Sequence, residues 1–150
     1  MPLLVMPVES ADEKAIALRL RFQVFPGELG YDPAVENDEL DDKDTTIHFL
    51  GKDGEQGDFV AVARCLVDPE NRSARIGRVA VLPESRGKQY GSALMNGIEA
   101  HVSSQVDVLG LSARTCRKSF YEKLGYACPS AETYVERGEE HCWMTKTIRC

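Results

Sequence analysis

The sequence contains a segment whose residue types favour the binding of a phosphate group. The apolar stretch Val79–Leu82 is followed by Pro83 and by a short segment rich in glycine and cations, Arg86–Gly91, which opens directly into an apolar helical pattern. Backbone N–H groups at the start of a helix lack partners, and the helix dipole favours negative charge there. Glycine lets the backbone approach a phosphate closely, and Arg86 and Lys88 add positive charge. We therefore predict a strand, a phosphate-binding loop and a helix in this order, with a solvated turn as the alternative interpretation.

Two commoner nucleotide-binding loops and a cysteine-based site do not fit the sequence. The segment lacks the Gly-Lys-Ser/Thr ending of a P-loop and the three-glycine spacing of a dinucleotide-binding loop. Cys116 stands at the start of a predicted helix, where a thiolate would be stabilised, but no histidine lies near it in a readable pattern. The cysteines are odd in number and show no CxxC spacing, which disfavours a zinc site or a disulfide framework and favours a reducing cytosol or nucleus. They are Cys65, Cys116, Cys128, Cys142 and Cys150.

Length and charge exclude some classes of function. The 150 residues are most simply one domain, 1–150, and their net charge of -6 disfavours broad nucleic-acid binding, which needs cations. No uninterrupted apolar run is long enough to cross a bilayer, and the short apolar start, Met1–Pro7, fits a first strand better than a signal peptide. The acidic segment Glu36–Asp44 is interpreted as a solvated face. Its functional alternative is attraction of a cationic acceptor, such as a polyamine, a lysine side chain or a peptide amino terminus.

Hydrophobic periodicity and turn residues predict strands and helices in an order typical of a mixed sheet. Ser10 and Glu13 indicate a capping box at the start of a helix over Ala11–Phe25, which Pro26 and Gly27 are expected to end. Strands are predicted at Met1–Pro7, Thr45–Leu50, Phe59–Val67, Ala74–Leu82 and Asp107–Ala113, and further helices at Tyr90–Ser103 and Cys116–Leu124, the latter stopped by Gly125. Tyr31–Asp44 is interpreted as a loop or a short helical turn, and Gly51–Gly54 as a turn. Glu132–Ile148 has strand character, with a hairpin broken at Gly138. This order predicts an α/β chain of the α+β type, with helices packed on a mixed, mainly antiparallel sheet.

The phosphate-binding segment and a second segment downstream resemble the motifs of one superfamily. The pattern Val81-x-Pro83-x-x-Arg86-Gly87-x-x-x-Gly91, followed by an apolar helix, resembles the acetyl-CoA-binding motif of the GNAT superfamily of N-acetyltransferases. Phe120–Tyr126 resembles the second hallmark of that superfamily, and the order of elements fits its fold along essentially the whole chain. The resemblance implies the GNAT fold, a mixed, mainly antiparallel central sheet of about six to seven strands flanked by about four helices.

A narrower resemblance is to the ElaA-like branch of this superfamily. Its early pattern is matched by Val24, Phe25, Glu28, Asp41, Asp42 and His48, and its C-terminal pattern by Tyr134, Glu136, Gly138, His141 and Met144. The sequence departs from the superfamily at Gln89, where the middle glycine of the loop is expected, and at Arg114, which has the spacing of the usual asparagine. A side chain at position 89 is compatible with the loop if its backbone stays in the α-region, but it limits close approach and could weaken pyrophosphate binding.

The resemblance also implies a chemistry. Acetyl-CoA would be the cosubstrate, without a metal, and an amine would attack the thioester directly, with no covalent enzyme intermediate. The backbone near Val79–Val81 would pair with the pantetheine arm, and the loop and helix start would hold the pyrophosphate. Tyr121 would protonate the departing thiolate, since a phenol stays protonated at neutral pH; the alternative is a core aromatic. The implied cofactor-binding residues are Val79, Ala80, Val81, Arg86, Gly87, Lys88, Gln89, Tyr90, Gly91 and Ser92.

Several groups could deprotonate the acceptor amine. Glu136 and His141 lie in the terminal strands, which line the acceptor side of this fold, so we place them ahead of His48 and Glu28. A neutral histidine can accept a proton near physiological pH, while a glutamate needs partial burial to do so. For each of them a structural or surface role is the alternative, and an ordered water chain could replace them.

The expected activity is acetyl-CoA-dependent N-acetylation of a primary amine, on a small molecule, a lysine or the amino terminus of a peptide. Two alternatives stay open: a non-catalytic acyl-CoA-binding or sensing domain, and transfer to an amino-sugar phosphate. Acceptor pockets have no readable sequence code, so the acceptor stays unidentified at this level. We further expect a cytoplasmic protein, with a nuclear location as the alternative, no nucleic-acid or membrane partner, and a homodimer as the commonest kind of assembly.

Overall fold

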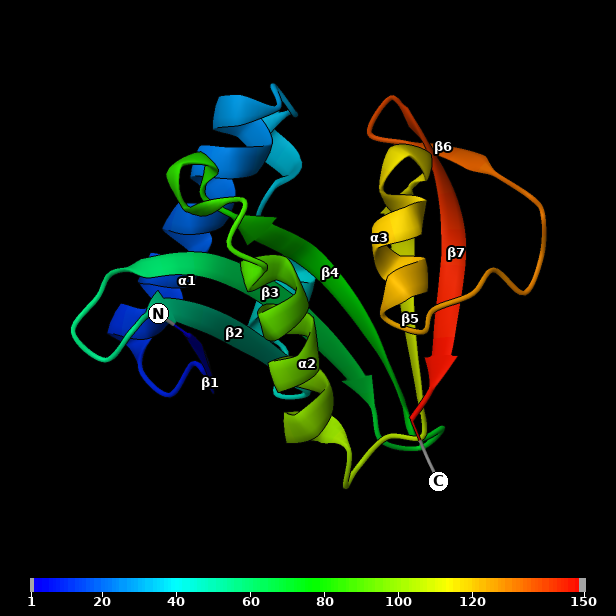
Figure 1. Cartoon of the computed structure of the whole chain (residues 1–150), viewed down its shortest axis with the longest axis horizontal. Coiled ribbons are helices and arrows are strands. Elements are labelled where there is room, and N and C mark those ends of the chain that lie inside the picture. Colours follow the sequence, from blue (N-terminus) through cyan, green and yellow to red (C-terminus); the bar gives the residue numbers. More distant parts are fainter. Residues whose placement is uncertain (1, 149–150) are drawn as a thin grey trace.

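Seven strands form one mixed sheet in the computed structural model of the chain, which describes residues 2–148 (Figure 1). Their order is β1-β2-β3-β4-β5-β7-β6, and every neighbouring pair is antiparallel except β4 and β5, which run parallel. The strands are β1 (Leu3–Pro7), β2 (Thr46–Asp53), β3 (Phe59–Asp68), β4 (Ser73–Val81), β5 (Val108–Arg114), β6 (Tyr134–Glu136) and β7 (Glu139–Thr147). The predicted fold class, helices packed on a mainly antiparallel mixed sheet, is confirmed.

Helices cover both faces of this sheet (Figure 1). On one face lie α2 (Tyr90–Val102) and α3 (Lys118–Lys123), and on the other lies α1 (Ala11–Phe22). The connections contain the π-helix η1 (Gln23–Glu28) and the 3-10 helices η2 (Pro33–Val35), η3 (Glu39–Asp42), η4 (Pro83–Ser85) and η5 (Thr115–Arg117). Within residues 2–148, no helix combines the length and the apolar character needed to span a membrane.

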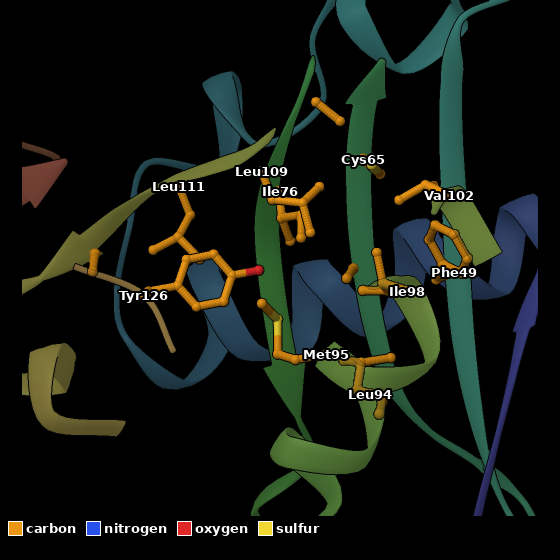
Figure 2. Close-up of a cluster of buried hydrophobic side chains, with 14 of the residues drawn as sticks. Phe49, Cys65, Ile76, Leu94, Met95, Ile98, Val102, Leu109, Leu111 and Tyr126 are labelled. Atoms are coloured by element: carbon orange, nitrogen blue, oxygen red, sulfur yellow. The ribbon is translucent and has the colours of Figure 1, made fainter. Parts of the chain in front are cut away.

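The amphipathic pattern of α2 explains its place on the sheet. Leu94, Ile98 and Val102 recur at helical spacing, and all three side chains are fully buried. Figure 2 shows them in one cluster with Phe49 of β2 and Ile76 of β4. The predicted core face of this helix is confirmed.

The first helix differs from its prediction at both ends. Ser10 caps it by accepting the N–H of Glu13 at 3.1 Å, but the Glu13 carboxylate accepts the N–H of Glu9 at 2.8 Å, one residue before the position that a capping box requires. At the other end, Pro26 and Gly27 do not end the helical path, because the chain continues through them as η1. A proline has no N–H to donate, and the wider π turn accommodates it.

The second strand extends three residues beyond its predicted end at Leu50. Gly51, expected in a turn, pairs with Val5 of β1, and the turn follows at Gly54–Gly57. The partner strand explains the difference, because β1 offers a hydrogen-bonding edge over this length. A Cβ at Gly51 would lie 2.8 Å from the Leu3 side chain, so glycine permits this close approach of β1.

The C-terminal elements agree with their prediction except in the first helical turn. Cys116 belongs to the 3-10 helix η5, and the α-helix begins at Lys118. The helix stops before Gly125, as predicted, and the φ of this glycine is 98°. The hairpin between β6 and β7 turns at Arg137 and Gly138, whose φ values of 52° and 79° suit a two-residue loop of type I′.

β4 and β5 separate halfway along β4, and this opens the sheet (Figure 1). Their pairing covers only Ser73–Ile76 of β4, so the edge from Gly77 to Val81 faces no strand on that side. A bulge lies at this point, since Ala63 on β3 faces both Arg78 and Val79, and the φ of Arg78 is 54°. Bulges bend a strand, so this one turns the end of β4 away from β5.

The prediction of a solvated acidic face is wrong for Glu36, which is 0% exposed. Its Oε2 accepts from Arg21 of α1 at 3.1 Å and from Arg78 of β4 at 3.0 Å, and its Oε1 lies 3.2 Å from Nη2 of Arg137 in the hairpin turn. The carbonyl of Glu36 also accepts from Arg21 and Arg78, at 2.7 and 3.1 Å. A single buried carboxylate therefore links α1, the bulge of β4 and the β6–β7 turn.

Asp41, expected on the same solvated face, is also buried. Its carboxylate accepts from Arg21 at 2.6 Å and from Arg64 at 3.1 Å. Burial alone would raise the pKa of Asp41, but hydrogen bonds from Arg21 and from the N–H of Asp38 hold it well below its ordinary value. Because this pKa is depressed in the folded state, the stability it contributes is present above about pH 4 and is lost as the pH falls below that.

The substitution Glu36→Gln should lower the free energy of unfolding by about 3–5 kcal/mol, because it removes the charge that compensates buried arginines. Asp42→Asn is the matched control: Asp42 is 78% exposed and pairs with Lys14, so its loss should cost less than about 1 kcal/mol. Urea unfolding followed by circular dichroism measures both variants. Equal losses in the two variants would contradict the central place given to Glu36.

Candidate active site

A cavity of about 650 Å³ opens where β4 and β5 separate. Its walls come from β4, the end of β5, the start of α2, α3, η1 and the β6–β7 hairpin. The residues predicted for catalysis, Tyr121, Glu136 and His141, all line it. So do all the residues predicted for cofactor binding except Lys88, namely Val79, Ala80, Val81, Arg86, Gly87, Gln89, Tyr90, Gly91 and Ser92.

The start of α2 presents backbone N–H groups at this cavity. No side chain caps the helix, and Gly91 and Ser92 precede Ala93, the first residue whose N–H donates along the helix, to the carbonyl of Gln89 at 3.2 Å. Just before them, Gly87 and Gln89 have left-handed backbone, with φ values of 82° and 62°, and such turns can gather N–H groups around an anion. A Cβ at Gly91 would lie 3.1 Å from the Phe120 ring, so the packing of α3 on this turn favours glycine. This geometry suits a pyrophosphate.

Gln89 does not keep the α-region backbone under which it was expected to fit the loop. Its φ of 62° and ψ of 25° are left-handed, a conformation that costs a residue with a Cβ about 1–2 kcal/mol. The loop therefore has the geometry expected of a glycine at this position, and Gln89 bears the steric cost.

Arg86 braces the loop. Its guanidinium donates to both carboxylate oxygens of Glu28 at 2.6 Å each, and its Nε donates to the carbonyl of Val81 at 2.9 Å. The hydrogen bond lowers the pKa of Glu28 and raises the pKa of Arg86, so both groups stay charged at neutral pH. The ammonium of Lys88 lies 3.9 Å from the Asp53 carboxylate instead of in the cavity wall. An anion at this loop would therefore contact mainly backbone groups.

Tyr121 lies on α3, with its ring centroid 4.9 Å from that of Phe120 and 6.1 Å from that of Tyr126. Burial raises the pKa of its phenol, and the charges of Arg117 and Arg114 oppose this shift. The net effect keeps the phenol protonated at neutral pH, as a proton donor requires.

The β6–β7 hairpin brings Glu136 and His141 together. Nδ1 of His141 lies 2.8 Å from the carbonyl of Glu139, which can only accept, so Nδ1 carries the proton and Nε2 faces the Glu136 carboxylate at 3.6 Å. Tyr134 donates to Ser112 and Ser112 donates to Glu136, each at 2.7 Å, which orients the carboxylate. An imidazole lone pair beside an oriented carboxylate can accept a proton.

Other candidate groups are not brought into position. His48 is buried, lies 3.0 Å from the carbonyl of Asp41 and does not line the cavity; burial lowers its pKa. Cys116 is exposed and lies outside the cavity wall. Glu28 lines the cavity, but its carboxylate forms an ion pair with Arg86. Within residues 2–148, His, Cys, Asp and Glu side chains form no group of three or more that could hold a metal ion.

Five of the seven arginines that line the cavity were not predicted as site residues, and they are Arg64, Arg75, Arg78, Arg117 and Arg137. Arg137 shows why. Its guanidinium lies 5.4 Å from the centroid of the Phe25 ring and 5.0 Å from that of Tyr31, and Tyr31 donates to Glu139 at 2.7 Å across 108 positions of sequence. Burial and the bond to Glu139 raise the pKa of Tyr31 to about 12. A recognisable signal existed for Arg64 alone, a cation inside an otherwise apolar strand pattern.

Comparison with known proteins finds related sequences. A family model described as an acetyltransferase (GNAT) domain matches residues 44–128, which contain β2 to β5, α2 and α3. The chain is also 30% identical over 134 residues to a protein of Bacillus subtilis (strain 168) named "Uncharacterized protein YyaT", with 88% of this chain and 87% of that protein covered.

Two solved structures have the same arrangement of elements. Escherichia coli ElaA is 26% identical, with a TM-score of 0.82 and 96% of this chain and 99% of that chain covered. An acyl-CoA N-acyltransferase from Pseudomonas aeruginosa is 27% identical, with a TM-score of 0.81 and coverage of 97% and 98%. The resemblance inferred from the two sequence motifs is thereby confirmed.

The substitution Gln89→Val should raise the dissociation constant for acetyl-CoA about tenfold, because a β-branched residue disfavours left-handed backbone and depopulates the loop geometry. Gln89→Asn is the matched control, since asparagine tolerates this conformation and should leave the constant within about threefold. Calorimetric titration of both variants measures the effect. If both substitutions left the affinity unchanged, the loop geometry would not control binding.

Proposed function

Since the chain belongs to the GNAT family of acetyltransferases, we propose that it transfers the acetyl group of acetyl-CoA to a primary amine by direct attack. One observation carries the proposal: a single cavity joins the open edge of β4, the uncapped start of α2 and Tyr121 to Glu136 and His141 on the hairpin. The cavity therefore contains a strand edge, an anion site, an acid and a base within one space.

The cofactor would bind at the separated strands. The edge of β4 from Gly77 to Val81 has no strand partner on the β5 side, and the amides of a pantetheine arm can pair with such an edge as a further strand would. The pyrophosphate would lie against the N–H groups of the Gly87–Ser92 turn, where the dipole of α2 favours negative charge. Arg86 would act by holding the loop against η1 through Glu28.

Proton transfers would accompany the attack. Nε2 of His141 takes a proton from the acceptor ammonium, and the amine nitrogen then bonds to the thioester carbon. The carbon–sulfur bond breaks, and Tyr121 gives its proton to the departing CoA thiolate. Arg114, whose charge acts on Tyr121, would stabilise the transient phenolate. The proton that the new amide nitrogen loses restores the phenol through solvent, and His141 releases its own proton to solvent.

The reaction would proceed without an acyl-enzyme intermediate. Cys116, the cysteine best placed in sequence to act as a nucleophile, lies outside the cavity wall. The arrangement of Tyr121 and His141 around one space supports a direct transfer, in which positioning and proton transfer supply the catalysis.

The domain and compartment belong to the same proposal. One sheet with a helix layer on each face supports a single acetyltransferase domain over 1–150. A cytoplasmic location fits the free thiols of Cys65, Cys116, Cys128 and Cys142, while Cys150 lies outside the described residues.

The substitution Tyr121→Phe should lower kcat about 10²-fold or more, because the thiolate loses its proton donor, while the dissociation constant for acetyl-CoA stays within about threefold. Tyr126→Phe is the matched control: its ring lies 6.1 Å from that of Tyr121 but does not line the cavity, so kcat should hardly change. Amine-dependent release of CoA measures kcat, and calorimetry measures binding.

Two results would count against the proposal. An unchanged kcat in Tyr121→Phe would remove this residue from the mechanism. Tight binding of acetyl-CoA by the wild-type protein, with no CoA release in the presence of any amine, would instead favour a non-catalytic acyl-CoA-binding domain.

A further inference from the structure

The acceptor end of the cavity is built largely from residues outside the segment that the family model matches. That segment covers residues 44–128, whereas η1, the loop after it and the β6–β7 hairpin contribute Phe25, Tyr31, Glu136 and His141. The chemical class of the acceptor therefore has to be argued from the side chains of this chain.

The charge of the cavity wall is mostly positive. Seven arginines line it, against the three carboxylates Glu28, Asp38 and Glu136. Arg86 donates hydrogen bonds to Glu28, and Arg64 donates to Asp38 at 2.7 Å. Among the lining residues that the structure describes, Glu136 is then the carboxylate that accepts no hydrogen bond from an arginine, since Arg75 lies 3.6 Å from it.

Two carboxylates of the acidic segment before β2 are not available to a polycation. Glu36 and Asp41 are buried, and their charges are compensated by Arg21, Arg64 and Arg78. The carboxylates of this segment that do stay exposed, Glu39, Asp42 and Asp44, lie outside the cavity wall, so the wall itself offers no acidic face to a polyamine.

The guanidinium of Arg75 is open to a ligand. Its guanidinium stacks on Trp143, 5.4 Å from the ring centroid, and its side chain is 51% exposed. Its ion-pair contact is with Oε1 of Glu136 at 3.6 Å, which is beyond hydrogen-bond distance. The donors of this guanidinium fork are therefore available to an oxyanion, which they can bind bidentately.

Glu136 lies between Arg75 and His141. Its Oε1 faces Arg75, and its Oε2 faces Nε2 of His141, each at 3.6 Å. Arg114 adds a second cation on the same wall, 3.8 Å from Glu139, whose carboxylate already accepts from Tyr31 at 2.7 Å. An acceptor's ammonium group could therefore contact Glu136 and His141, and an anionic group of the same acceptor could contact Arg75.

We propose that the amine acceptor also carries an oxyanion group, a carboxylate or a phosphate, which Arg75 binds while Glu136 and His141 hold the amine. This inference rests on the proposed function and specifies its substrate class. A second ammonium group in the acceptor would face arginines in a partly desolvated cavity, where like charges repel strongly. The wall thus selects against polyamines as well as for anionic amines.

The test compares acceptors that differ in the anion alone. Wild-type protein is assayed for CoA release with a panel of amino acids and their carboxamides, with glucosamine 6-phosphate and glucosamine, and with spermidine. The kcat/KM should be about tenfold or more higher for the anionic member of the productive pair. The amino acid and sugar phosphate arms distinguish a carboxylate from a phosphate.

The variant Arg75→Gln should lose this preference through a higher KM for the anionic acceptor, while the dissociation constant for acetyl-CoA stays unchanged. Arg19→Gln, on the exposed face of α1, removes the same charge outside the cavity and should keep the wild-type preference. Higher kcat/KM with spermidine or with neutral amines, or an unchanged preference in Arg75→Gln, would overturn this inference and leave the acetyltransferase proposal standing. If none of these amines caused release of CoA, the proposed activity itself would be overturned.

Discussion

The carboxylate of Glu36 holds two walls of the cavity, β4 and the β6–β7 hairpin, against helix α1. It binds Arg21 of α1, Arg78 at the bulge of β4 and Arg137 at the β6–β7 turn, and it is completely buried. Because a buried charge is stable only with its partners in place, these elements hold one relative position. The bulge that Arg78 occupies is also the place where β4 leaves β5, so the ion-pair cluster and the opening of the sheet belong to one arrangement.

The two ends of the cavity have different physical origins. At the cofactor end, neighbouring residues in sequence make the site: the edge of β4, the left-handed turn at Gly87 and Gln89, and the start of α2 follow one another directly. At the acceptor end, contacts between distant residues make the site, such as the hydrogen bond from Tyr31 to Glu139. The first end suits a cofactor shared by a family, and the second can vary with the acceptor.

This difference explains how much could be predicted from the sequence. The strand, loop and helix around Arg86–Gly91 follow from local periodicity and glycine placement, and so does the core face of α2. The burial of Glu36 could not be predicted, because a carboxylate in an acidic stretch normally faces water, and its three arginines lie far away in the sequence. The left-handed backbone of Gln89 was missed for a related reason, since surrounding packing can impose a conformation that the residue type disfavours.

The most direct test of this account is hydrogen exchange, measured by mass spectrometry, with and without acetyl-CoA. If the cofactor lies between the separated strands, exchange should slow at the amides of Gly77–Val81 and of Gly87–Ser92, while the paired strands β1 and β2 stay unchanged. Protection confined to another part of the chain, in a protein that binds acetyl-CoA saturably, would contradict the assignment of this cavity as the cofactor site.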